Sequence, residues 1–370
     1  MKTEIKKKSR LRLLYGICPI RHTLTLAGLA VIALHLLLRD NHALMAWLSD
    51  RIIHPAHRIL SRLCSHVPFS VAEVLICTFF ISLIAYTAVK LTTLRKAADK
   101  GKEVYIIFVT PICAAVCVYA LFSVMWGTYY YGDDFTTRMG LSCESVSTQR
   151  LADTTRYFAR LANEYADKVS RDENGVYNAD RDELLERSAS VFENAEKKFP
   201  CLAGDGLCAK GFHLSPALSC LDFTGFFFPF TGEANVNTDF PPALFAATVA
   251  HELSHQRGVA REQEANFVAV LASLEYGDAD YVYSAALLAY THLGNALHKA
   301  DREAWLEIYN SLDANIIADF ENDRAYWQRF ETPVQSVSDT VYEGFLQSYD
   351  QELGLRSYGA CVDLLVDYYG

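Results

Sequence analysis

The sequence has no CxxC pair, no glycine-rich phosphate loop, no internal repeat and no low-complexity tract. Without CxxC, its ten cysteines lack the spacing of the common cysteine-based zinc sites. Without a glycine-rich loop, it offers no motif that cradles the phosphates of a nucleotide. A chain of 370 residues is longer than one that usually folds around a single hydrophobic core, so its length predicts about two structural units.

Basic residues are scarce in the C-terminal two-thirds of the chain. The first 126 residues hold 16 of the 34 Lys and Arg residues but only 6 of the 44 Asp and Glu residues. The rest of the chain therefore carries 18 basic and 38 acidic side chains, an excess of 20 negative charges. Because such a surface repels phosphate, we expect no nucleic-acid partner.

Three apolar runs lie in the basic N-terminal part, at about residues 23–38, 69–89 and 104–126. The second and third are long enough to cross a hydrocarbon core of about 30 Å. The first is shorter, and the basic segment before it also fits a signal peptide, but no small-residue cleavage site follows Leu38. We therefore predict three membrane helices, a membrane unit of residues 1–126 and the lipid bilayer as a partner.

Positive charge is unevenly distributed among the segments that flank these runs. Seven Lys and Arg residues lie in the N-terminal tail and five in residues 90–103, whereas four are spread over residues 39–67. Because short cytoplasmic loops retain positive charge, this predicts a multi-pass plasma-membrane protein with residues 127–370 outside the cytoplasm. Disulfides can form there, and Cys201 and Cys208 bracket a short turn that a disulfide can close.

The rest of residues 127–370 shows two kinds of sequence pattern. Residues 145–170, residues 179–198 and several segments between residues 280 and 368 show the spacing of amphipathic helices. The aromatic stretch at residues 222–242, which glycine and proline punctuate, predicts strands and turns.

The segment HELSHQRGVAREQEAN, residues 251–266, contains an HExxH motif. It continues a predicted helix that begins after two prolines and ends at Gly258. His251 and His255 are four residues apart, so they lie on one helix face and can share one Zn²⁺ ion. Glu252 can take a proton from a water molecule that zinc acidifies and pass it to a leaving amine. The pattern predicts a metallopeptidase active site, although an exposed polar face with two structural histidines is the alternative.

The third zinc ligand depends on the shape of the chain after His255. In one unbroken helix, Glu262 would lie about 10.5 Å beyond that histidine, out of bonding range. Gly258 supplies the break, because glycine takes the left-handed conformation that ends a helix. We predict Glu262 as the ligand and Glu264, about 200° around the second helix, as the alternative. Asn266, on the same face as Glu262, is expected to hold a ligand imidazole.

Four stretches, TGEANVN, HELSHQRGVAREQEANFVA, WGTYYYGDDF and LRSYGACVDLLVDYY, give the chain a resemblance to a known family. It resembles, over nearly its whole length, bacterial integral-membrane proteins of domain-of-unknown-function family 3810, which are grouped with HExxH zinc peptidases. The resemblance implies site roles for His251, Glu252, His255 and the helix after Gly258. It also implies the fold class: mainly α, with three N-terminal transmembrane helices followed by a zincin-like, gluzincin-like α+β metallopeptidase domain at residues 127–370. A small β element precedes the HExxH helix.

The resemblance to zinc peptidases also suggests where a substrate binds. Many of these enzymes place an edge strand beside the active-site helix, and an extended peptide pairs with it as an added strand. Ala234, Asn235, Val236 and Asn237 are the natural residues for that strand. In the alternative interpretation, Glu233 and the two asparagines terminate and cap a hairpin.

Zinc peptidases usually stabilise the oxyanion with a Tyr or His from a later helix, for which Tyr290, His292 and His298 are candidates. Two functions remain open at this point. The first is a membrane-anchored zinc peptidase acting on a peptide or membrane-protein substrate. The second is a non-catalytic binding or sensory membrane protein that retains the zinc-site shape. Intact Glu252 favours the peptidase, because a binding protein has no need of a water-activating carboxylate.

Overall fold

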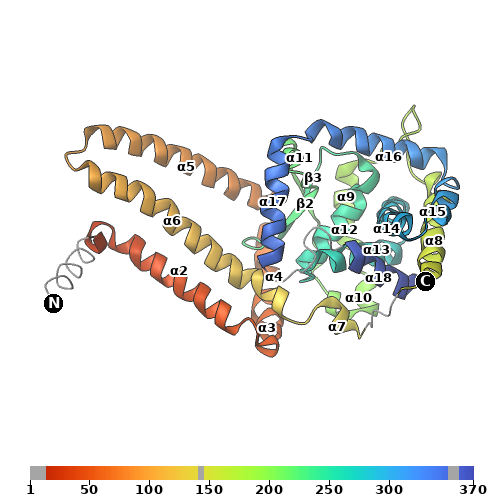
Figure 1. Ribbon diagram of the computed structural model, residues 1–370, viewed down its shortest axis with the longest axis horizontal. Coiled ribbons are helices and arrows are strands. Elements are labelled where there is room, and N and C mark those ends of the chain that lie inside the picture. The colour runs from red at the N-terminus through yellow and green to blue at the C-terminus, as the bar shows by residue number, and fades with distance from the viewer. Residues whose placement is uncertain (1–13, 141–145, 349–357) are drawn as a thin grey trace. The chain divides into compact units, whose positions relative to one another are not determined.

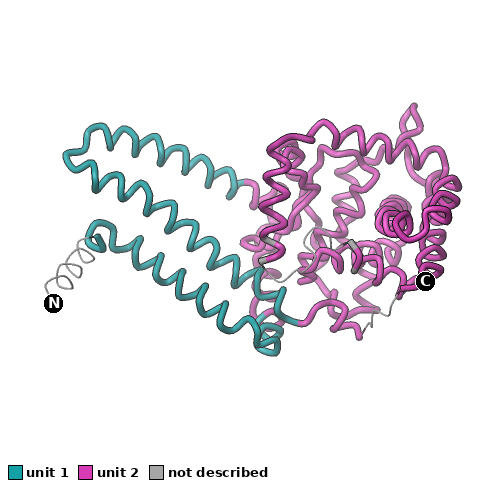
Figure 2. The backbone as a smooth tube through the Cα atoms, in the orientation of Figure 1, with its two compact units in different colours: residues 1–48, 74–132 teal, residues 49–73, 133–370 magenta. Residues whose placement is uncertain are grey.

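The computed structural model describes residues 14–140, 146–348 and 358–370. The chain divides into two compact units (Figure 2): unit 1 is formed by residues 1–48 and 74–132, and unit 2 by residues 49–73 and 133–370. The predicted boundary after residue 126 lies near the division after Gly132. The sequence did not predict that residues 49–73, which lie between the first two apolar runs, belong to the second unit.

Unit 1 is helical (Figure 1). Its elements are α2 (Pro19–Leu38), α3 (His42–Leu48), α5 (Val71–Lys96, whose first three residues belong to unit 2), α6 (Lys100–Met125) and the 3₁₀ helix η2 (Gly127–Tyr131). Among the described residues, α2, α5 and α6 are long and apolar enough to cross a membrane, which confirms that prediction. In the most apolar stretch of each helix, only 6%, 0% and 17% of the residues are buried. Such exposed apolar surface needs an apolar solvent.

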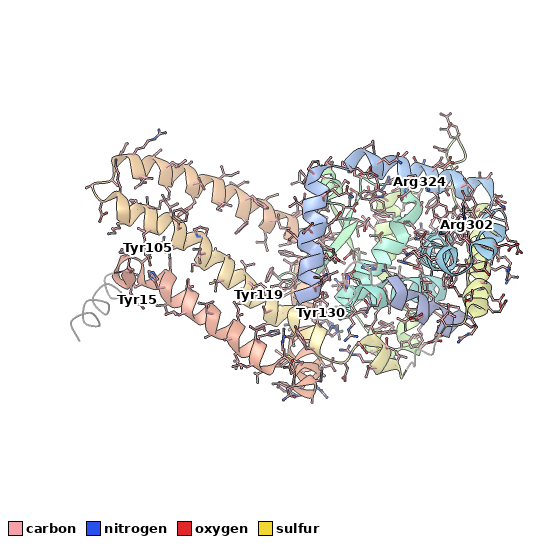
Figure 3. All side chains as sticks on the ribbon, in the orientation of Figure 1. Tyr15, Tyr105, Tyr119, Tyr130, Arg302 and Arg324 are labelled. Atoms are coloured by element: carbon pink, nitrogen blue, oxygen red, sulfur yellow. The ribbon has the colours of Figure 1, made fainter. Side chains whose placement is uncertain are left out.

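Aromatic side chains mark both ends of the pair formed by α2 and α6. Figure 3 shows Tyr15 and Tyr105 toward one end and Tyr130 at the other. The Tyr105 hydroxyl lies 2.7 Å from His22 Nε2, and the Trp126 indole donates to the Tyr130 hydroxyl over 3.2 Å. Tyrosine and tryptophan favour the two interfaces of a bilayer, so this arrangement agrees with a membrane-spanning pair.

Unit 2 is a helical body around a small sheet (Figure 1). Its longer helices are α4 (His54–Cys64), α8 (Thr148–Ala166), α12 (Phe245–Gln256), α13 (Glu262–Tyr276), α14 (Ala279–Ala300), α15 (Arg302–Tyr309), α16 (Ala314–Trp327), α17 (Pro333–Ser348) and α18 (Tyr358–Tyr369). Shorter ones are η1 (Ser49–Ile53), α7 (Phe135–Met139), α9 (Arg181–Arg187), η3 (Ser188–Ser190), α10 (Ala195–Lys198), η4 (Pro200–Leu202), α11 (Ser215–Cys220), η5 (Pro242–Leu244) and η6 (Gln328–Phe330).

The core of unit 2 lies where α14 packs against α8, α12, α13 and α18. The apolar stripe predicted in residues 145–170 faces this core, because Leu151 and Phe158 of α8 are buried. Residues 179–198 do not form the single helix that their spacing suggested; α9 and α10 are separate short helices. Cys201 and Cys208 are free, each against a different neighbour, so the disulfide considered above is not formed.

The sheet has three strands in the order β1 (Lys210–Phe212), β3 (Glu233–Asn237), β2 (Gly225–Phe228). β1 runs parallel to β3, and β2 runs antiparallel to it with Gly225 opposite Val236. The aromatic stretch thus contains the predicted strands β2 and β3, whereas β1 was not predicted. Every residue of the central strand β3 is buried.

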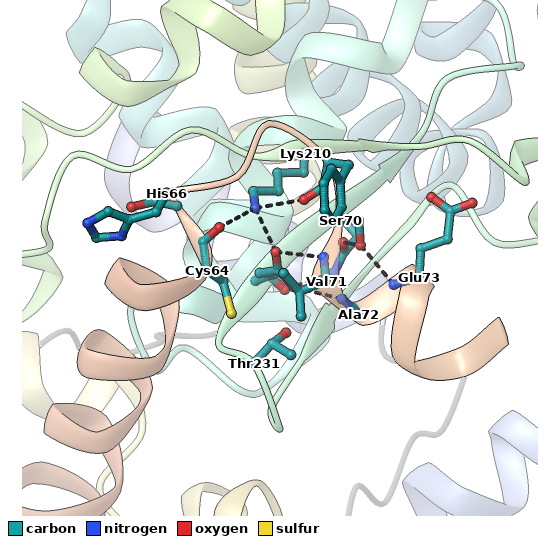
Figure 4. Close-up of polar contacts among 12 residues, drawn as sticks. Cys64, His66, Ser70, Val71, Ala72, Glu73, Lys210 and Thr231 are labelled. Carbon is teal, nitrogen blue, oxygen red and sulfur yellow. Dashed lines mark hydrogen bonds and ion pairs between the residues drawn. The ribbon is translucent and has the colours of Figure 1, made fainter. Parts of the chain in front are cut away.

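Glu233, the first residue of β3, is tied to the segment that opens α5. Figure 4 labels its partners Val71, Ala72 and Lys210. The Glu233 carboxylate accepts hydrogen bonds from the backbone N–H groups of Val71 at 3.1 Å and Ala72 at 2.8 Å. Lys210 Nζ lies 2.8 Å from the same carboxylate and also donates to the Phe69 carbonyl. The negative charge therefore sits at the N-terminus of a helix, where the helix dipole stabilises it.

The helix α4 is held to unit 2 by charge. Arg58 and Arg62 both pair with the carboxylate of Asp205, whose side chain is 7% exposed. Hydrogen bonding from Arg58 lowers the pKa of Asp205 to about 2, against the opposing effect of burial. Residues 49–73 are thus an integral part of unit 2, even though they lie between two apolar helices in the sequence.

Candidate metal centre

The HExxH motif lies on α12, which forms as predicted. A single 3₁₀ turn, η5, precedes it, and Phe245, Val249 and Leu253 are fully buried along one face. His251 and His255 project from one side of this helix with their ring centroids 4.7 Å apart. The apolar face anchors the helix in the core, and the two imidazoles stand next to each other.

Gly258 reverses the chain after α12. Its φ is +82°, a left-handed conformation that other L residues adopt only with strain. The Gly258 N–H donates to the His255 carbonyl, and the Val259 N–H donates to the Ser254 carbonyl, so the end of the helix is capped. The break that the third ligand requires is therefore present, and α13 begins four residues later at Glu262.

The three predicted ligands converge. Glu262 Oε2 lies 3.2 Å from His251 Nε2 and 3.7 Å from His255 Nε2, and the three ligand atoms all lie within 4.8 Å of one another. Ligands placed 2.0 to 2.1 Å from a tetrahedral zinc ion are about 3.4 Å apart. The donor set and its spacing therefore fit zinc.

Both imidazoles are oriented by a second hydrogen bond. His255 Nδ1 donates to the Val259 carbonyl over 2.6 Å, and His251 Nδ1 lies 2.9 Å from Asn266 Oδ1. These bonds occupy the Nδ1 atoms and leave Nε2 of each ring directed at Glu262. The predicted contact between Asn266 and a ligand imidazole is present.

The comparisons with known proteins confirm the family of the resemblance but say nothing of its grouping with zinc peptidases. A family model described as "Protein of unknown function (DUF3810)" matches residues 49–366. The chain belongs to the DUF3810 family. Neither a curated protein nor a solved structure matches it. The matched range begins at Ser49, the first residue of unit 2. It also contains the whole cluster of His251, His255 and Glu262.

The second glutamate of α13 has a different role in this DUF3810 member. Glu264 is 2% exposed, and its carboxylate accepts from the backbone N–H groups of Phe135 at 3.1 Å and Thr136 at 2.9 Å. It also accepts from the Thr136 hydroxyl. Since these donors hold both oxygens at the start of α7, Glu262 is the glutamate that the structure brings to the histidines.

Charges within the cluster shift the pKa values of His255 and Glu262. Burial opposes the protonation of His255, but the Glu262 carboxylate outweighs it and raises the pKa of His255 to about 9. Burial also opposes ionisation of Glu262, yet His255 and His251 hold its pKa well below the ordinary value. Two imidazoles and a carboxylate are the donor types of a cation site, and a bound cation would displace the proton of His255, because an imidazole ligates a metal only in its neutral form.

Glu252 faces the sheet. It is 3% exposed, burial raises its pKa to about 7, and among the described residues its Oε2 atom has no hydrogen-bond partner. A Cβ atom on Gly225 of β2 would lie 2.7 Å from Glu252 Cγ and Oε1. The carboxylate thus occupies space that any side chain at position 225 would fill, and one of its oxygens is ready for a proton-bearing partner.

Tyr342 of α17 was not predicted. Its hydroxyl donates to Glu262 Oε1 over 2.8 Å, and its ring packs edge-on against Phe223 with the centroids 5.5 Å apart. The sequence signal for it is weak, because one tyrosine on an amphipathic helix usually packs in a core. Tyr342 gains a role only because α17 folds back to the site and brings its hydroxyl to Glu262, 80 residues earlier in the sequence.

Two of the later-helix residues named from the sequence pack against other aromatic side chains. Tyr290 packs against Phe320, and His298 packs against Trp305. His292 is buried, and its pKa is lowered to about 4 by burial and, to a lesser extent, by the charge of His251. His292 is thus close enough to His251 to be affected by its charge, whereas the Tyr342 hydroxyl bonds directly to Glu262.

The prediction that residues 234–237 form an edge strand for the substrate is wrong. Ala234, Asn235, Val236 and Asn237 belong to the central strand β3, which pairs with a strand on each side, so they cannot pair with an added peptide. The alternative, that Glu233 and the two asparagines terminate and cap a hairpin, holds only in part: Glu233 and Asn237 are the first and last residues of β3, whereas Asn235 lies in its middle. Asn235 Oδ1 accepts from the Ser70 hydroxyl, and Asn237 Oδ1 accepts from the backbone N–H of Asp239, so both hold neighbouring segments in place.

The edge beside Glu252 belongs to β2. The Asn237 N–H donates to the Thr224 carbonyl, so this opposed pair is hydrogen-bonded, and the next pair, Gly225 and Val236, is not. The N–H and C=O of Gly225 therefore point away from β3, toward the outer edge. In the described residues no strand pairs with that edge.

Proposed function

We propose that this protein is a membrane-anchored zinc peptidase that hydrolyses peptide bonds with Glu252 as general base. The observation that carries the proposal is the convergence of three zinc-type ligand atoms within 4.8 Å beside a buried glutamate that has one unpartnered oxygen. A protein that only retained the shape of a zinc site would have no use for a buried carboxylate at that position, because burying it is costly.

The ligands would be His251, His255 and Glu262. A bound zinc ion would supply Lewis acidity, which polarises a substrate carbonyl and acidifies water. Glu252 accepts the proton of the attacking water and delivers it to the nitrogen of the leaving amine. Its raised pKa favours this task, since a base that later acts as an acid works best near the operating pH.

Two further groups of the chain would act on the substrate. The Tyr342 hydroxyl, which is 2.8 Å from Glu262, donates a hydrogen bond to the oxygen of the scissile carbonyl as negative charge develops there. The outward N–H and C=O of Gly225 pair with the substrate backbone, as an added strand does at a sheet edge. Because Gly225 touches Glu252, this pairing places the peptide bond next to the base.

The test uses the full chain in lipid nanodiscs. Metal analysis is expected to find about one zinc ion per chain, and a peptide library is expected to be cleaved. Glu252→Gln should retain zinc and lose turnover by at least about 10²-fold, as loss of a general base does. Glu303→Gln, the same change at an exposed position on α15, is the matched control and should match the wild type. Absence of zinc, or full activity of the Glu252 variant, would favour the non-catalytic binding or sensory protein.

We also propose that unit 2 faces away from the cytoplasm, with the apolar helices as its anchor in the plasma membrane. The support is the positive charge of the N-terminal tail and of residues 90–103. A reporter that is active only in the cytoplasm should stay silent when fused after Trp126. The same reporter fused after Asp99, between α5 and α6, should be active. A strong signal from the Trp126 fusion would reverse the orientation.

A further inference from the structure

An apolar cavity of about 770 Å³, broadly open to solvent, lies beside the metal centre, between α17 and the segment that leads into β2. Its lining includes Leu221 and Phe223 on one side and Val334, Val337 and Val341 on the other. The valines follow helical spacing, so they form one face of α17. They are 56%, 64% and 67% exposed, which is unusual for side chains of this kind gathered on one helix face.

Tyr342 connects the cavity to the metal centre. It lines the cavity, and its hydroxyl bonds to the third ligand, Glu262. The sheet edge provides a second connection, because Phe223 lies two residues before Gly225, which touches Glu252. Two residues of extended chain span about 7 Å. A group in the cavity is therefore within one or two residues of a peptide bond held at Glu252.

The cavity has no charged side chain in its lining, and its polar groups are already engaged. The Ser338 hydroxyl donates to the Leu221 carbonyl over 2.9 Å, and the Tyr342 hydroxyl donates to Glu262. A charged or strongly polar occupant would lose hydration on the side that faces this lining without gaining a partner there. The volume lies within the range of ligand pockets and exceeds what one side chain fills.

We infer that this cavity is the specificity pocket of the metal centre and that it takes large aliphatic or aromatic side chains of a peptide next to the scissile bond. The inference rests on the proposed function and names its substrate class. A peptide suits the place better than a lipid chain, because the Gly225 N–H and C=O beside the cavity offer main-chain hydrogen bonds that an acyl chain cannot use.

The first experiment compares peptides that differ at one position. The full chain in nanodiscs, loaded with zinc, is given fluorogenic peptides with Leu or Phe, or with Ser or Lys, on either side of the cleaved bond. We expect kcat/KM for the apolar peptides to exceed that for the polar ones by about 10- to 100-fold, as burial of one large apolar side chain allows. Equal rates for all four would overturn the inference.

The second experiment changes the cavity. Val337→Glu places a charge in its wall at a position that is 64% exposed, so the fold should not suffer. The preference for Leu and Phe should disappear, and the Lys peptide should gain. Ser336→Glu adds the same charge to the same helix at an exposed position outside the lining, and it should keep the preference. Zinc content and melting temperature, measured for both variants, should equal those of the wild type. Identical behaviour of the two variants would remove the cavity from substrate selection.

The third experiment separates this inference from the proposed function. Glu252→Gln is expected to bind zinc without cleaving, so labelled peptides can be titrated onto it directly. Binding of the Leu or Phe peptide, and its loss when Val337→Glu is added, would support the pocket even if the wild type cleaves nothing. Cleavage of peptides without apolar preference would leave the peptidase in place and overturn the pocket. Binding of labelled oleate, with no binding of any peptide, would assign the cavity to lipid instead.

Discussion

The two walls of the metal centre are held in different ways. The inner wall, α12 and α13, is packed into the core, and each ligand imidazole has a second hydrogen bond, from His251 to Asn266 and from His255 to Val259. The outer wall, β2 and α17, has a sheet edge with which no strand of the described residues pairs, and a row of exposed valines. The inner wall fixes the ligands, whereas the outer wall leaves backbone and apolar surface available to a substrate. Changes to the inner wall should therefore alter metal binding, and changes to the outer wall should alter turnover.

The largest effect is expected from the two glutamates of α13. Glu262→Ala should weaken zinc binding by more than the roughly 10- to 100-fold that loss of an outer hydrogen-bond partner costs, because a ligand itself is removed. Glu264→Ala should change zinc affinity slightly and lower the melting temperature, since its carboxylate caps the start of α7. Competition with a chromophoric chelator measures both affinities. The reverse ranking would move the ligand role to Glu264.

The outer wall should respond in turnover alone. Tyr342→Phe removes one hydrogen-bond donor beside Glu262 and should lower kcat by about 10²-fold, as loss of one oxyanion donor does, with zinc content unchanged. Tyr309→Phe, at a partly exposed position on α15, is the control. A rise in KM with kcat preserved would show that Tyr342 only positions Glu262 or the substrate. Loss of zinc in this variant would break the distinction between the walls.

The inner wall was also the part that the sequence predicted. His251, His255, Glu262 and Asn266 come together through helical spacing and one left-handed glycine, which act over sixteen residues of one segment. The apolar runs that became α2, α5 and α6 were equally local signals, since length and composition define them. The DUF3810 family is described as of unknown function, so membership in it names no substrate.

The outer wall was not predicted, because it depends on contacts between distant segments. Tyr342 reaches Glu262 across 80 residues, and Glu233 receives the start of α5 across 161 and 162 residues. The order of the strands also depends on distant segments. The local sequence of β3 does not indicate that β1 pairs with it on the side opposite β2. A strand that looked suitable for an edge was therefore assigned to substrate binding, while β2, which is separated from the end of α11 by four residues, took the edge.

A smaller loss of turnover is expected from Gly225→Ala. The added Cβ would lie 2.7 Å from the Glu252 carboxylate and 2.9 Å from the Asn235 carbonyl, so either the base or the strand must move. A displacement of this size should lower kcat/KM by about 10- to 100-fold without loss of zinc. Gly294→Ala is the control, because its Cβ would meet nothing closer than 3.6 Å. An unchanged rate would show that Glu252 can move without consequence, which a general base in fixed geometry cannot do.

The smallest effect is expected at Asn266, on the inner wall. Its Oδ1 atom lies 2.9 Å from His251 Nδ1 and keeps the other nitrogen of that ring directed at Glu262. Asn266→Ala should weaken zinc binding by about 10-fold, the lower end of what an outer-shell partner contributes, because His251 itself remains. Asn266→Asp keeps an acceptor at the same place and should restore the affinity. Chelator competition separates the two variants, and turnover at saturating zinc should stay near the wild-type value in both. Equal affinity of the Ala variant and the wild type would mean that packing alone orients His251, and a turnover defect that excess zinc does not repair would place Asn266 with the outer wall.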